Sequence, residues 1–175
     1  MIKPLSKEKY KDYPLHFAYE TIEYYDVSIN EEDNQFTVIF TKEKFDSPIK
    51  KTFDSKLFQP YLENPTAYGY FIDEKIVGVL EVNFDSWSKR LRVTELLIDI
   101  QYRRHGIGKT LMNQAKKFAK ELGARSIILE TQTCNTKAID FYRSQGFKLI
   151  GFDSTCYSNN DIENKEVRVE LGFNI

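Results

Sequence analysis

Apolar residues are organised most clearly from residue 68 onward, where short runs of β-branched and aromatic residues alternate with polar turns. Residues 68–72 and 76–84 predict two strands joined by a turn at Asp73-Glu74, which is typical of a hairpin. The Leu-rich and β-branched run 91–99 predicts a strand in a central position of a sheet. Further strands are expected over residues 126–131, 147–152 and 166–173.

Helical periodicity appears in two places between these strands. Residues 106–122 repeat apolar side chains every three or four positions, and the lysines fall mainly on the other side, so one face of this helix should pack on the sheet. Gly123 suits the left-handed position that follows a helix. Residues 136–144 predict a second, short helix. The order β-β-β-α-β-α-β-β indicates an α/β fold with a strand-helix-strand crossover.

The region before residue 68 gives a weaker pattern. Residues 6–25 mix polar residues with large apolar ones and predict one or two short helices. Residues 31–34 are acidic and predict a solvated turn, and residues 36–40 predict a β-rich run.

Length, charge and cysteine content narrow the class of protein. A chain of 175 residues without repeats or linkers predicts a single domain over residues 1–175. A net charge of -1 supplies no basic face for nucleic acid. No segment reads as a signal peptide or a membrane span, which predicts a cytoplasmic protein. Cys134 and Cys156, without a CxxC motif, are expected to be free thiols, and no metal site is indicated.

The segment Arg103-Arg104-His105-Gly106-Ile107-Gly108-Lys109-Thr110 lies between a predicted strand and a predicted helix. Glycines at a helix start allow close approach of the backbone to a phosphate, and the free N–H groups and the helix dipole favour negative charge. Gly108-Lys109-Thr110 imitates the end of a P-loop, but Arg103 stands where that motif needs glycine. A dinucleotide fingerprint fails as well, because its third glycine would fall on Leu111. A turn with close packing is the remaining alternative to a phosphate site.

Two motifs together resemble those of the GNAT superfamily of N-acetyltransferases. Arg103, Gly106 and Gly108 fit R-x-x-G-x-G, and a second match runs from Asn135 through Ala138 and Phe141-Tyr142 to Gly146-Phe147. The resemblance covers about residues 68–175. It implies the GNAT acyltransferase fold, an α/β domain with a mixed, mostly antiparallel central sheet flanked by helices, and acetyl-CoA as cosubstrate. Arg104 stands where many relatives have glycine.

The resemblance also implies which residues bind acetyl-CoA. The first motif would bind its pyrophosphate and pantetheine, Asn135 would lie near the cofactor and Tyr142 near its sulfur. Backbone N–H groups of the strand that ends at Ile98 would polarise the thioester carbonyl. The cofactor-binding set is therefore Ile98, Arg103, Arg104, His105, Gly106, Ile107, Gly108, Lys109, Thr110, Asn135 and Tyr142.

Acetyl transfer to an amine requires a base and an acid, because an alkylammonium with a pKa near ~10 must lose a proton and the departing thiolate must gain one. Glu95, which interrupts an apolar strand, is the candidate base, and Tyr142 is the candidate acid. The alternatives are that Glu95 caps the strand or pairs with a surface lysine, and that Tyr142 is a core aromatic. Asn135 also suits the N-cap of the helix after it.

Residues 129–133 and 153–160 resemble the streptothricin acetyltransferases, a GNAT group that acetylates a polycationic antibiotic. A small cationic amine would favour acidic residues near the acceptor. The expected substrate-binding residues are Glu81, Trp87, Asp153 and Asp161; solvated carboxylates, and a Trp87 that covers the hairpin, are the alternatives. A protein or peptide N-acetyltransferase and a non-catalytic coenzyme A-binding module also stay open. The protein is expected to be a monomer or homodimer.

Overall fold

A computed structural model describes residues 1–175. The chain forms two compact units. Unit 1 contains residues 1–17, 53–129 and 172–175, and unit 2 contains residues 18–52 and 130–171. None of the helices is both long and apolar enough to span a membrane.

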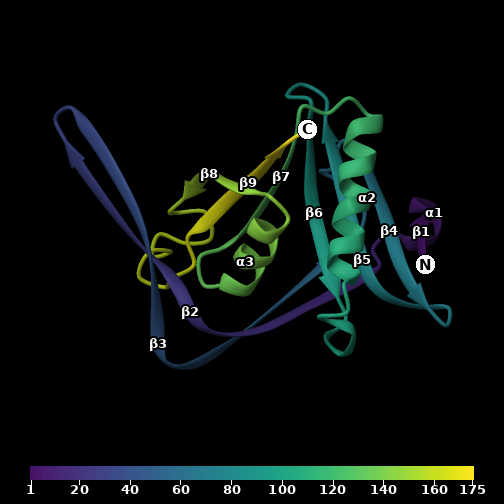
Figure 1. The fold of residues 1–175 in the computed structure, drawn as a ribbon, viewed down its shortest axis with the longest axis horizontal. Coiled ribbons are helices and arrows are strands. Elements are labelled where there is room, and N and C mark those ends of the chain that lie inside the picture. The colour runs from purple at the N-terminus through teal and green to yellow at the C-terminus, as the bar shows by residue number, and fades with distance from the viewer. The chain divides into compact units, whose positions relative to one another are not determined.

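Unit 1 is built on a mixed sheet (Figure 1). Its strand order is β1-β4-β5-β6-β7, and the first three pairings are antiparallel whereas β6 and β7 run parallel. The mixed, mostly antiparallel sheet that the family resemblance implied is therefore confirmed. The bounds are β1 Ile2–Leu5, β4 Pro65–Ile72, β5 Lys75–Asp85, β6 Arg90–Ile98 and β7 Ser126–Gln132. The predicted turn at Asp73-Glu74 joins β4 and β5, and both residues have positive φ, which suits a tight hairpin.

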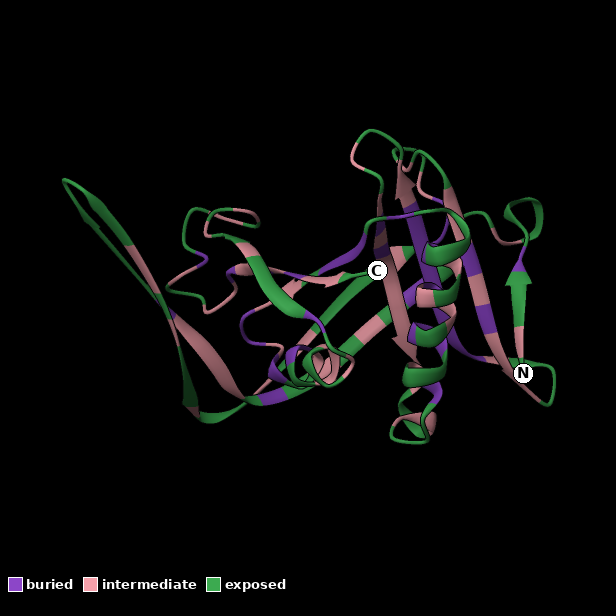
Figure 2. Cartoon of the chain, turned by 45° about the horizontal axis from the view of Figure 1, so that its top comes forward, coloured by how far each residue is buried: buried purple, intermediate pink, exposed green.

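Helix α2, Ile107–Glu121, packs its apolar face on one side of this sheet, as its periodicity predicted. A Cβ at Gly78 of β5 would meet Ile107 at 3.0 Å and Leu111 at 3.2 Å, so helix and strand are in close contact. The buried stripe of the helix is visible in Figure 2. At its C-terminus Gly123 has a φ of 66°, and its N–H donates to the Lys120 carbonyl. The predicted glycine cap is confirmed.

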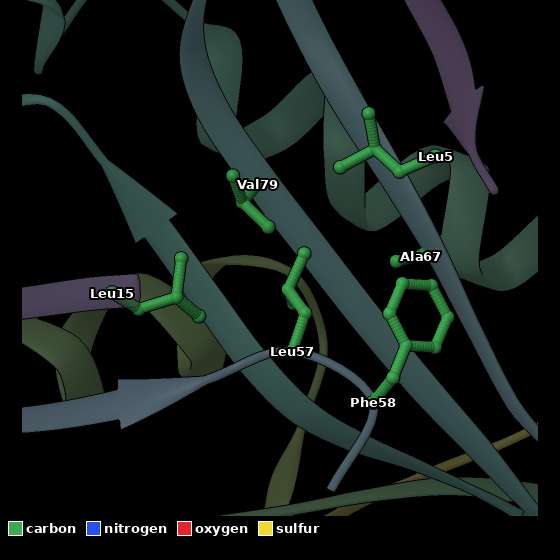
Figure 3. Packing of buried hydrophobic residues seen from close by; sticks show 6 residues of the cluster. All are labelled: Leu5, Leu15, Leu57, Phe58, Ala67 and Val79. Carbon is green, nitrogen blue, oxygen red and sulfur yellow. The ribbon is translucent and has the colours of Figure 1, made fainter. Parts of the chain in front are cut away.

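Unit 1 also contains a cluster of buried apolar side chains (Figure 3). Full burial of one such large aliphatic side chain stabilises the fold by roughly 1.5–3 kcal/mol. Partly buried Leu97 of β6 packs against this cluster, and the 4-residue helix α1, Lys7–Tyr10, contributes Tyr10. The buried members are Leu5, Leu15, Leu57, Phe58, Ala67 and Val79.

The second segment of unit 2 begins within β7, at residue 130, and contains α3, Thr136–Ser144. Its strands follow the order β7-β9-β8. Strands β8, Lys148–Asp153, and β9, Arg168–Asn174, follow the predicted runs closely. The Gly146 N–H donates to the Arg143 carbonyl, and the Phe147 N–H donates to the Tyr142 carbonyl. This pair of bonds is a Schellman motif, and it explains why the helix stops before Gly146, whose φ is 90°.

The first part of the chain corrects one prediction. Residues 6–25 were expected to form short helices, but only α1 is helical, and β2 runs from Pro14 to Glu32. The reason is a period of two, because Leu15, Phe17, Tyr19 and Thr21 are less exposed than the residues between them. The turn at residues 33–34 is present. The predicted β segment at residues 36–40 extends into the 22-residue β3, Gln35–Lys56, which pairs with β2 as a two-stranded sheet.

Candidate active site

The segment between β6 and α2 folds into a short, tied loop. Asp99 accepts a hydrogen bond from the Gln101 N–H at the start of the 3₁₀ helix η1, Ile100–Tyr102. The Arg103 Nε then donates to the Ile98 carbonyl oxygen at 3.1 Å, which ties the loop to the end of β6. Arg104 follows with a φ of 67°, in the left-handed region. Such a conformation favours glycine, the residue that the family resemblance implies at this position.

The N-terminus of α2 has the geometry of an anion site. Gly106 is the N-cap with a φ of 79°, and no side chain caps the helix. A Cβ at Gly106 would meet nothing within 4 Å, so this side of the loop is open. Arg104, His105 and Lys109 are exposed around it. First-turn N–H groups without a side-chain acceptor, together with nearby cations, suit a phosphate group.

Strand β6 is irregular where the candidate base lies. Its parallel pairing with β7 covers Arg90–Arg92, whereas its pairing with β5 continues to Ile98. Glu81 of β5 is the register partner of Glu95, but Val82 is the partner of Val93, so Thr94 is the extra residue of a β-bulge. Beyond Arg92, β5 is therefore the strand neighbour of β6.

Glu95 is partly buried in unit 1 and accepts a hydrogen bond from the Ser55 hydroxyl. Ser55 comes from the end of β3, far from Glu95 in the sequence, and no motif pointed to it. Its contact is a tertiary feature that the sequence reasoning missed. A partly buried carboxylate with a hydroxyl donor has the chemistry of a proton acceptor.

Two of the carboxylates expected to bind substrate have no exposed surface. Glu81 accepts from the Phe58 N–H at 2.6 Å and from the Thr94 hydroxyl at 2.8 Å. Burial raises its pKa above the ordinary value of 4.5, against the opposing effect of these two donors. Asp161, in unit 2, accepts from the Tyr157 N–H and the Ser158 hydroxyl, each at 2.8 Å. Both carboxylates thus have partners within the protein.

The other two expected substrate-binding residues are exposed. Trp87 of unit 1 has 84% of its surface exposed, and the Arg90 guanidinium lies 5.9 Å from the centre of its ring. Asp153 of unit 2 accepts hydrogen bonds from the Thr155 N–H and hydroxyl. Substrate binding by Glu81, Trp87, Asp153 and Asp161 stays a prediction.

The second motif lies in unit 2, on α3. Asn135 is the N-cap of this helix, and its side chain accepts from the Ala138 N–H at 3.3 Å, so the capping role is confirmed. Tyr142 is partly buried between two rings, with centroid distances of 5.3 Å to Phe141 and 6.1 Å to Phe147. The packing role of Tyr142 is therefore real, and a role in proton transfer would be additional.

The structure divides the predicted site residues between the two units. Unit 1 brings together the end of β6, the loop to α2 and the pair Glu81 and Glu95. Unit 2 holds Asn135 and Tyr142 on one helix. A mixed sheet that leads through a glycine-containing loop into an uncapped helix agrees with the acyltransferase class of fold that the motifs implied.

The chain belongs to the Acetyltransferase (GNAT) family, which it matches over residues 15–147. It is 35% identical over 91 residues to a streptothricin acetyltransferase of Streptomyces lavendulae, covering 52% of this chain and 48% of that protein. The chain thus spans about half the length of that relative. It is 28% identical over 123 residues to streptothricin acetyltransferase A of Bacillus subtilis strain 168, covering 69% and 70%.

Two solved structures share the fold of the chain over nearly their whole length. A nourseothricin acetyltransferase superposes with a TM-score of 0.77 at 24% identity, covering 99% of this chain and 97% of that one. A putative streptothricin acetyltransferase from Bacillus anthracis, solved in complex with acetyl coenzyme A, gives 0.73 at 23% identity, covering 100% and 97%. The predicted family and fold class are confirmed.

Proposed function

We propose that this protein is an acetyl-CoA-dependent N-acetyltransferase that moves the acetyl group directly to a primary amine of a small cationic molecule. The observation that carries the proposal is the open, uncapped N-terminus of α2 behind Gly106, in a chain of the GNAT family. The complex of the Bacillus anthracis structure with acetyl coenzyme A supports the choice of cosubstrate.

The loop after β6 would bind the pyrophosphate. The first-turn N–H groups of α2 would donate to its oxygens, and Arg104 and Lys109 would add positive charge. The Arg103 Nε donates to the Ile98 carbonyl, which holds the Arg103 side chain beside the end of β6. The remaining members of the predicted cofactor set, His105 and Thr110 among them, stay proposals for the same role.

The chemistry would need three proton transfers, two from the acceptor nitrogen and one to the departing sulfur. Glu95 would take a proton from the ammonium form of the acceptor, and the free amine would attack the thioester carbonyl carbon. N–H groups of β6 beyond Arg92, on the side without β7, would donate to the oxyanion. When the carbon–sulfur bond breaks, the Tyr142 hydroxyl would donate its proton to the thiolate. The extra proton on the attacking nitrogen would then return to the Tyr142 phenolate, directly or through water, which leaves a neutral amide.

Calorimetric titration with acetyl-CoA tests the proposal first, because a protein that does not bind it cannot use it. Thiol release is then followed with a panel of acceptors that includes streptothricin, polyamines and peptides. Release with cationic small amines is expected. Activity confined to peptides would reassign the acceptor, and binding without release from any acceptor would leave a coenzyme A-binding module.

Two variants test the proton transfers. Glu95→Gln and Tyr142→Phe should each lower kcat at least roughly tenfold, the lower part of the range for acid–base catalysis, with little change in affinity for acetyl-CoA. Unchanged turnover in either variant removes that residue from the mechanism.

A further inference from the structure

Glu81 is the buried carboxylate of unit 1, and it contacts two irregular backbone segments at once. Its Oε1 accepts from the Phe58 N–H at 2.6 Å and its Oε2 accepts from the Thr94 hydroxyl at 2.8 Å. Phe58 is 2% exposed and has a φ of 59°, which is a strained conformation for a bulky residue. Thr94 is the extra residue of the bulge in β6.

A strained backbone conformation like that of Phe58 persists only where the surrounding structure holds it in place. Bulges redirect the side chains that follow them and are frequent beside active sites. A carboxylate that bonds to both segments fixes one relative to the other, because each carboxylate oxygen has one of them as its donor. Burial makes these hydrogen bonds costly to break without replacement.

The same two segments carry Ser55 and the proposed base, Glu95, which are hydrogen-bonded to each other. Glu95 directly follows Thr94, and Ser55 precedes Phe58 by three positions. The Ser55 hydroxyl donates to Glu95, so this hydrogen bond also joins the two segments. Glu81 and Glu95 are also register partners on adjacent antiparallel strands. Their side chains consequently extend from the same face of the sheet.

We propose that Glu81 is a positioning residue that sets the orientation of Glu95 through the Thr94 bulge and the Phe58 segment. The inference rests on the proposed function, in which Glu95 is the base. It differs from the direct contact with substrate predicted for Glu81 from the sequence, because both carboxylate oxygens already accept hydrogen bonds from the protein.

Steady-state kinetics with Glu81→Met separate the two roles. Loss of both acceptors should lower kcat at least roughly tenfold and displace the acidic limb of the kcat–pH profile, whose pKa values report the base in the enzyme–substrate complex. KM for the amine should change less than about twofold, because a positioning residue does not itself bind the amine. Glu81→Gln should recover most of kcat, since its amide oxygen can accept from Phe58 and its NH₂ can donate to the Thr94 hydroxyl.

Asn83→Leu is the matched control. Asn83 lies two residues further along β5, is also buried, and accepts from the Asn64 N–H at 2.8 Å. Its side-chain amide donates to Asp85, so its hydrogen bonds do not go to Phe58, Thr94 or Glu95. Asn83→Leu should lower the free energy of unfolding without displacing the acidic limb of the kcat–pH profile. The proposal is overturned if Glu81→Met raises KM with kcat unchanged, or if its kcat falls no more than that of Asn83→Leu.

A second variant keeps the test open if Glu81→Met does not fold. Thr94→Val removes only one hydroxyl and should lower kcat with KM unchanged; full kcat overturns the proposal. Hydrogen exchange of the Phe58 amide supplies a readout independent of activity, with faster exchange expected in Glu81→Met. If wild-type protein fails to bind acetyl-CoA, or Glu95→Gln keeps full turnover, the proposed function or its base fails instead, and this amide still reports on the contact.

Discussion

Arg104 shows how one backbone angle connects sequence and site. Its φ of 67° lies in the left-handed region, which favours glycine, yet an arginine occupies the position. Left-handed geometry costs an L-residue roughly 1–2 kcal/mol. The guanidinium is exposed beside the open N-terminus of α2, where a contact with a phosphate group would offset this cost.

The variant Arg104→Gly separates shape from charge. Relief of strain is offset by the roughly 0.5–1 kcal/mol entropic cost of glycine, so the free energy of unfolding should stay within about 1 kcal/mol of wild type. Affinity for acetyl-CoA should fall about fivefold, as expected for the loss of roughly 1 kcal/mol of phosphate contact. Lys89→Gly, at a cation with a φ of 50° in the turn before β6, is the control and should leave affinity unchanged. Equal affinities in all three proteins would exclude Arg104 from the phosphate site.

Glu81 makes stability depend on pH with a definite sign. Its folded-state pKa is raised by burial, so it favours the folded state below 4.5, where the carboxyl is protonated in both states. Above that value the unfolded chain releases the proton more readily, and this contribution is lost as pH rises through the raised pKa. The free energy of unfolding of wild type should therefore decline relative to Glu81→Gln as pH increases, measured by urea titration. A constant difference would mean that the pKa is not raised.

At the scale of elements, the helices α2 and α3 end where the sequence indicated. The predicted short helix at residues 136–144 coincides with α3, and α2 lies within the predicted residues 106–122. Local signals suffice in these cases, because apolar spacing and a terminal glycine act within a few residues of each other. The strand β2 was missed for the complementary reason, since polar residues between its half-buried positions hid a period of two.

Two glycines at opposite ends of α2 form a natural pair of variants. Gly106 and Gly123 have φ values of 79° and 66°, and a Cβ at either would meet nothing within 4 Å. Alanine should therefore destabilise both by roughly 1–2 kcal/mol through backbone strain alone. Only Gly106→Ala should also weaken acetyl-CoA binding, because only that end faces the proposed phosphate site. Equal weakening by both variants would point to a general loss of stability.

For the whole molecule, ligand binding and folding are linked. Acetyl-CoA at one hundred times its Kd should stabilise the folded state by about 2.7 kcal/mol. For a chain of this size that corresponds to a rise in Tm of roughly 5–10 °C, measured by differential scanning fluorimetry. Gly108→Trp, which fills the first turn of α2, should abolish the rise. If stabilisation persists, the cofactor binds elsewhere on the protein. The extent of the domain, the cytoplasmic location and the choice between monomer and homodimer stay predictions.

The sequence by itself determined the loop from Arg103 to Thr110, the helices on either side of Ser126–Gln132, and the family to which the chain belongs. These features depend on residues close together in the chain, whose spacing reports directly on local geometry. Only the tertiary structure decided that Ser55 donates to Glu95 and that Glu81 joins Phe58 to Thr94. Those contacts link segments 13 to 40 positions apart. Strand register and a bulge bring them together, and neither leaves a short-range signal in the sequence.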